Sequence, residues 1–74
     1  MDTAVVLAFV NRQPESFLVI EGRGIFREID GRECRIMRNN IKGGILITGF
    51  DKIIHLVWDK ESSKWTPFSA CKVG

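Results

Sequence analysis

Short apolar segments, separated by residues typical of turns, make up most of this chain. The first segment, from Ala4 to Val10, lacks polar alternation, which predicts a strand covered on both faces or lying at a subunit contact. Ser16 to Ile20 predicts a second strand, which Gly22 and Gly24 end. Glycines then recur too often for a helix of about ten residues in the middle of the chain. The pattern therefore predicts strands throughout.

Ile25 to Met37 predicts a β-hairpin, because Asp30-Gly31 is a strong turn pair. A two-residue loop would place Glu28 opposite Glu33, and such a like-charge pair costs about a few tenths of a kcal/mol. A three-residue loop, with Gly31 in a left-handed bulge, instead gives both glutamates an arginine partner. We expect this register, with the pairs Glu28–Arg32, Arg27–Glu33 and Phe26–Cys34. In this register the core face carries Phe26, Cys34 and Ile36. The opposite face carries Arg27, Glu33, Arg35 and Met37.

Two further strands are expected at Ile45–Thr48 and Ile53–Trp58, joined by a turn that contains Gly49. Alternation in the second of them separates two faces: Ile54, Leu56 and Trp58, against Ile53, His55 and Val57. The apolar residues between 51 and 60 would also suit a helix, but their β-branched side chains and the flanking turn residues favour a strand.

The polar residues from Asp59 to Lys64 predict a loop before a last strand. If these two residues close the loop, Trp58 and Trp65 lie directly opposite each other, an aromatic pair worth about 0.5–1 kcal/mol. Pro67 lacks an amide hydrogen, so this strand lies at a sheet edge or bends there.

We predict an all-β domain of five to seven short antiparallel strands, closed as a small barrel because closure removes exposed strand edges. Residues 68–71 are expected to end it as a 3₁₀ turn or a short strand. The segment Val57-Trp58 … Trp65-Thr66-Pro67-Phe68-Ser69 resembles the late hairpin and closing turn of SH3-like barrels. The alanine-leucine-aspartate-tyrosine start of the signalling SH3 domains is missing and the chain has no Tyr, so the resemblance does not imply their groove for proline-rich ligands.

The 74 residues allow one small domain that spans residues 1–74, and the net charge of +2 selects no partner. No apolar run approaches the ~20 residues that cross a bilayer, and the N-terminus lacks the features of a signal peptide. We therefore expect a cytoplasmic protein without a membrane partner. In that compartment Cys34 and Cys71 are expected as free thiols, one of them in the core, although the sequence also allows a bridge between them.

Candidate chemistry is sparse. His55 is the only histidine, and its alternation with apolar neighbours favours a histidine packed in a sheet over a catalytic base. Cys34 shares the expected core face, which favours packing over nucleophilic catalysis. The histidine and the two cysteines show no metal-ligand spacing. We therefore predict neither an enzyme, nor a cofactor, nor a metal.

Nucleic-acid binding is one functional possibility. Residues 32–42 contain four basic side chains and one acidic side chain. A hairpin that presents such a cluster could contact phosphates, and the candidate residues are Arg27, Arg35, Arg38 and Lys42.

Protein binding is the favoured possibility. Several predicted strands carry apolar residues on both faces, whereas a small barrel has only one inner face to cover them. A chain this short also buries only roughly 60–65% of its surface when it folds alone. We therefore predict a small non-enzymatic binding or adaptor protein that acts through protein–protein contacts as a homodimer. The residues expected at the self-association surface are Val5, Ile47, Ile53 and Val57.

Overall fold

The computed structural model describes residues 3–20, 23–39 and 43–68. The protein is mostly β, with a short helical segment followed by five strands. The elements in chain order are α1 (Thr3–Val10), the 3₁₀ helix η1 (Pro14–Phe17), β1 (Ile25–Ile29), β2 (Arg32–Arg38), β3 (Ile45–Thr48), β4 (Ile54–Asp59) and β5 (Lys64–Pro67). No helix among the described residues has the length and apolarity that crossing a bilayer requires.

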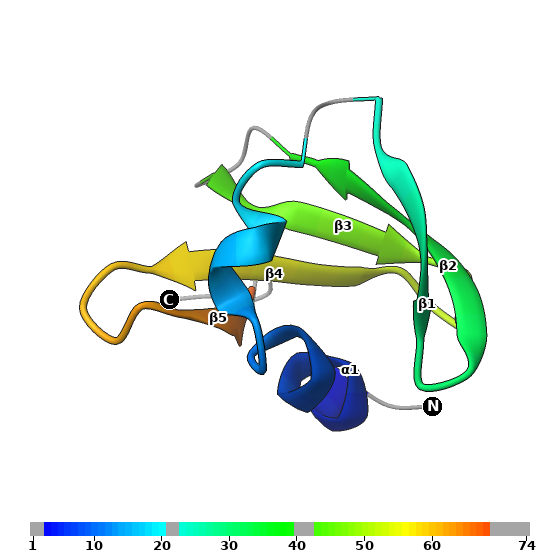
Figure 1. Cartoon of the computed structure of the whole chain (residues 1–74), viewed down its shortest axis with the longest axis horizontal. Helices are drawn as coiled ribbons and strands as arrows, with labels where there is room; N and C mark the ends of the chain where they lie inside the picture. The colour runs from blue at the N-terminus through cyan, green and yellow to red at the C-terminus, as the bar shows by residue number, and fades with distance from the viewer. Residues whose placement is uncertain (1–2, 21–22, 40–42, 69–74) are drawn as a thin grey trace, which may run out of the picture.

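The strands form one antiparallel sheet in the order β1-β2-β3-β4-β5. Figure 1 shows α1 and η1 on one side of this curved sheet. We call that side the inner face and the opposite side the outer face. The small all-β fold is thus confirmed, with five strands, but the predicted barrel is wrong, because the sheet is not closed and β1 and β5 remain its two edges.

The N-terminal segment explains why the sheet stays open. Residues 4–10 and 16–20, predicted as strands, instead form most of α1 and the last two residues of η1 with the turn that follows it. Val6 and Val10 lie one helical turn apart and are both fully buried, whereas Ala4 and Ala8 are exposed. An apolar run without alternation therefore reflects a helix that buries one face, and this segment covers the inner face of the sheet instead of extending it.

The core lies between the N-terminal segment and the inner face. Each strand contributes at least one buried side chain to it, and the larger ones are Ile29, Ile36, Ile45, Ile47, Leu56 and Trp65. Predicted features of the C-terminal half are confirmed: Asp59 pairs with Lys64, and Trp58 faces Trp65 with the ring centroids 5.3 Å apart in an edge-to-face arrangement. Pro67 ends the edge strand β5, and the expected closing turn at 68–71 lies outside the described residues from residue 69 onward.

The β1–β2 hairpin forms, but the predicted register is wrong. Glu28 pairs with Glu33, and Phe26 pairs with Arg35 instead of Cys34. The turn is the two-residue type, since Asp30 and Gly31 both have positive φ, at 52° and 81°. A shift of one residue moves every side chain of a strand to the other face. It places Phe26 outside and Arg27 inside, against the expectation that Arg27 shares a face with Arg35.

The turn and the core together decide this register. The type I′ backbone matches the twist of the two strands, and Ile29 becomes fully buried on the inner face. Burying one isoleucine is worth about 1.5–3 kcal/mol, which exceeds the repulsion of one glutamate pair at about a few tenths of a kcal/mol. Cys34 and Ile36 stay in the core as predicted, with 2% and 0% of their surfaces exposed.

Candidate functional site

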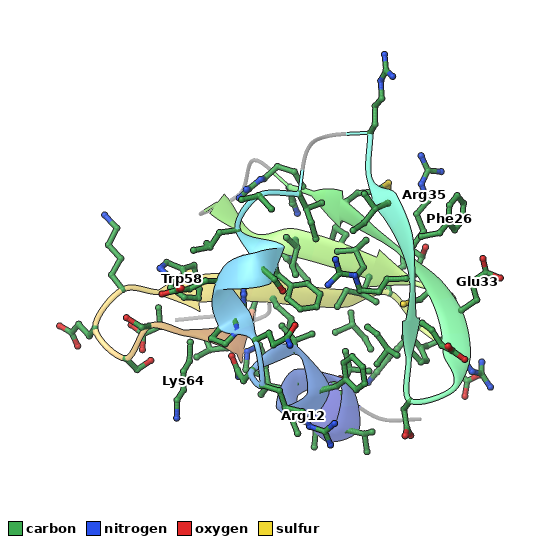
Figure 2. All side chains as sticks on the ribbon, in the orientation of Figure 1. Arg12, Phe26, Glu33, Arg35, Trp58 and Lys64 are labelled. Atoms are coloured by element: carbon green, nitrogen blue, oxygen red, sulfur yellow. The ribbon has the colours of Figure 1, made fainter. Side chains whose placement is uncertain are left out.

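Phe26 is the most conspicuous apolar side chain on the sheet. It lies on the outer side of the edge strand β1 and remains 70% exposed. Figure 2 shows Phe26, Arg35 and Glu33 projecting from the hairpin away from the N-terminal segment. We call the four neighbouring outer residues Phe26, Glu28, Glu33 and Arg35 the Phe26 surface. Its charges are unevenly placed, with acids on one side of the aromatic ring and a base on the other.

The basic side is held in position by contacts within the chain. The Arg35 guanidinium lies over the Phe26 ring, with Cζ 5.8 Å from the ring centroid. Its Nη2 donates a hydrogen bond of 2.8 Å to the carbonyl oxygen of Arg23. The side chain passes Gly24, where an added Cβ would lie 3.3 Å from Arg35 Nε. Arg35 therefore presents a fixed positive charge beside the ring.

The acidic side carries an unrelieved repulsion. Glu28 and Glu33 are directly opposite each other in the hairpin. Within the described part of the chain, neither carboxylate makes a hydrogen bond or an ion pair. Like charges in this position destabilise a hairpin by about a few tenths of a kcal/mol. A cation from outside the chain would remove that cost.

The inner side of β1 also has apolar surface near the free edge. A hollow of about 290 Å³ lies between the strand and the segment after η1, lined in part by Val19, Ile20 and Ile25. Val19 is 77% exposed at its rim. Apolar side chains therefore lie on both sides of the β1 edge.

The structure does not gather the residues predicted to contact nucleic acid. Arg27 is on the inner side of β1, with Cζ 4.9 Å from the centroid of the Phe17 ring. Arg38 is half-buried, and its guanidinium donates to the carbonyl oxygens of Leu18, Ile20 and Gly43. Of the candidate residues that the structure describes, only Arg35 projects from the outer face of the hairpin. Lys42 lies outside the described residues.

The residues predicted for self-association are also dispersed. Ile47 is fully buried in the core together with Ile36, its partner in β2. It is therefore unavailable to a partner, contrary to expectation. Val5 is 41% exposed on α1, Ile53 is 63% exposed just before β4, and Val57 is half-buried within β4.

His55 and Cys34 have shifted acidities. Burial lowers the pKa of His55, whose Nε2 lies 3.0 Å from Nδ2 of Asn39. Burial raises the pKa of Cys34, an effect that the positive charge of Arg27 opposes and the negative charge of Glu33 reinforces. The Cys34 thiol donates to the carbonyl oxygen of Arg27 at 3.1 Å. Cys71, its possible bridging partner, lies outside the described residues.

No three side chains of the metal-binding types come together in residues 3–20, 23–39 and 43–68. Comparisons with protein-family models, with curated proteins and with solved structures find no match for this chain.

Sequence reasoning missed the Phe26 surface because it placed Phe26 in the core. The signal was present in the Asp30-Gly31 pair, which favours a two-residue turn and so turns Phe26 outward. In the sequence, the repulsion between Glu28 and Glu33 argues against that register. In the structure it is instead a feature of the surface.

Proposed function

We propose that this chain is a small non-enzymatic binding protein that acts through protein–protein contacts, and that the partner at the Phe26 surface is a second copy of the same chain. The observation that carries the proposal is an exposed aromatic side chain between an acidic and a basic side. Aromatic side chains at the centre of an interface commonly supply much of its binding energy.

The charge arrangement favours a copy over an unrelated partner. A two-fold axis through Phe26 brings the acidic side of one chain onto the basic side of the other, and it does so twice. Arg35 of each copy then meets the Glu28–Glu33 pair of its partner. Such complementarity favours association and fixes its orientation.

The size of the domain supports association as well. A chain of 74 residues buries a smaller fraction of its surface on folding than a larger domain does. Covering the exposed part of Phe26 in both copies adds apolar burial that the monomer lacks. Removing one large apolar side chain from water is worth about 1.5–3 kcal/mol.

Nucleic-acid binding has less support from the geometry. Phosphate binding by counterion release needs several free cations on one surface. Arg27 and Arg38 make contacts within the chain on the other side of the hairpin or at its end. The experiment therefore includes a single-stranded oligonucleotide. Binding to this oligonucleotide that weakens steeply with salt would favour the nucleic-acid-binding function over the dimer.

Sedimentation velocity across micromolar to millimolar concentrations tests the proposal. We expect the fraction of a species with twice the 8.4 kDa chain mass to increase with protein concentration. High salt is expected to weaken this association. Phe26→Ser is expected to shift the protein to the monomer. Ile53→Ser is the matched control, since Ile53 is exposed to a similar degree, at 63% against 70%. A wild-type protein that stays monomeric throughout, or a Phe26→Ser variant that associates like wild type, contradicts the proposal.

A further inference from the structure

The two edge strands of the sheet differ in whether their outward backbone groups have hydrogen-bond partners. At β5, the Asn11 side chain accepts a hydrogen bond from the Trp65 amide at 2.8 Å and donates one to the Trp65 carbonyl oxygen at 3.0 Å. It occupies the place that a neighbouring strand would take. Pro67 removes a further donor from the same edge. Edge β5 is therefore closed to another strand.

Edge β1 has no comparable cover from the residues that the structure describes. In a hairpin with a two-residue turn, the two residues that flank the turn point their backbone groups at each other, and the next residues alternate outward. Ile29 and Arg32 flank the turn. The amide and carbonyl groups of Phe26 and Glu28 therefore point to the free edge, and no other part of residues 3–20, 23–39 and 43–68 forms hydrogen bonds with them.

We infer that two copies join edge to edge through β1, as an antiparallel strand pair with its two-fold axis at Phe26. The inference rests on the proposed function and specifies how the copies meet. The two five-stranded sheets then become one continuous sheet, and the outward backbone groups of both β1 strands form hydrogen bonds with each other.

Charge selects this register over the two registers whose axes lie nearer the turn. An axis perpendicular to the sheet keeps inner residues inner and outer residues outer, so it passes through one residue of the strand. An axis at Glu28 would set Glu28 against itself, and an axis at Arg27 would set Arg27 against itself. An axis at Phe26 instead pairs the two aromatic rings and places Glu28 opposite Gly24 of the second copy.

That placement gives Glu28 a partner. Arg35 passes directly over Gly24, where a side chain would lie 3.3 Å from its Nε. Glu28 of the second copy therefore faces the Arg35 guanidinium and relieves the repulsion with Glu33. On the inner side, Ile25 of the second copy lies opposite Arg27, beside the hollow lined by Val19 and Ile20.

Charge reversal tests the register. Glu28→Arg and Arg35→Glu each replace an attraction by a repulsion at both ends of the interface, and each is expected to weaken dimerisation by about tenfold or more. The double variant Glu28→Arg with Arg35→Glu restores opposite charges across the interface and is expected to recover most of the affinity. Glu61→Arg, an exposed position in the β4–β5 loop, is the control and leaves the dissociation constant unchanged.

Amide hydrogen exchange of the wild-type protein, followed by NMR, tests the strand pairing without a substitution. Raising the concentration through the dissociation constant is expected to slow exchange at the amides of Phe26 and Glu28. The Thr66 amide in β5 is the internal reference and keeps its rate.

The outcomes separate the two claims. A protein that never dimerises overturns both the proposed function and this inference. The edge pairing is overturned if neither single reversal changes the dissociation constant of the dimer. It is also overturned if the protected amides lie away from Phe26 and Glu28. In both cases the proposed function still stands. Weakening by the single reversals without recovery in the double variant also overturns the register.

Discussion

Nδ2 of Asn39, the residue after β2, lies 3.0 Å from Nε2 of His55 in β4, although β3 lies between these two strands in the sheet. An amide nitrogen donates, so this contact requires an unprotonated Nε2. Phe68 packs against the same imidazole, with the ring centroids 4.5 Å apart. His55 is thus a neutral histidine packed into the outer face, as the alternation of its strand indicates.

The stability of the protein is therefore expected to fall as His55 is protonated. Burial lowers the pKa of His55 below its ordinary value of 6.5, so the unfolded chain binds the proton first as pH decreases. The stability that the neutral imidazole contributes is present above pH 6.5 and is lost as pH falls through the lower pKa of His55 in the folded state. Urea unfolding at pH 7.5 and pH 5 is expected to show a larger loss for wild type than for His55→Gln, which has no charge to gain. Equal losses in the two proteins would contradict this account.

Arg38 is expected to be a structural residue. Its guanidinium donates to the carbonyl oxygens of Leu18, Ile20 and Gly43, so it ties the end of β2 to the segment after η1. Arg38→Lys keeps the charge but loses the planar fork, and we expect the free energy of unfolding to fall by about 1–3 kcal/mol. Denaturant unfolding measures this loss. Arg23→Lys, the same substitution at an exposed position, is the control. Equal stability of the two variants would show that the fork is dispensable.

The sequence predicts the C-terminal half of this fold well because each strand there has an independent local signal. Turn residues bound the apolar runs of β3 and β4, polar residues mark the loop at 59–64, and Pro67 marks an edge. The N-terminal half offers only a continuous apolar run, which a buried strand and a helix with one buried face produce alike. Length, the usual arbiter, fails for an eight-residue helix.

The candidate site was less predictable, since its residues depend on tertiary contacts. Arg38 looks like any other arginine of a basic segment until its three carbonyl partners are known. Phe26 changes face with a one-residue change in register. Ile47 belongs to a run of three apolar residues, so only the fold shows which of its strand's faces is buried.

Cys34 is expected to react slowly with alkylating reagents. The residue is only 2% exposed, and burial raises the pKa of Cys34, so the reactive thiolate is scarce at neutral pH. In a Cys71→Ser background, iodoacetamide is expected to modify the native protein at least about tenfold more slowly than the protein in urea. Mass spectrometry follows the added group. Equal rates in both conditions would place the thiol at the surface and contradict the packed core.

Asn11 is expected to stabilise the protein through the two hydrogen bonds that it exchanges with the backbone of Trp65. Asn11→Ala removes both and leaves a part-buried amide and carbonyl without partners, so we expect the free energy of unfolding to fall by about 1–3 kcal/mol. The same change opens edge β5, and light scattering is expected to show larger assemblies growing with concentration, since each chain then has two pairing edges. Gln13→Ala is the control, because Gln13 is exposed and its side chain bonds with no described residue. A variant with wild-type stability and assembly would show that the asparagine does not close this edge.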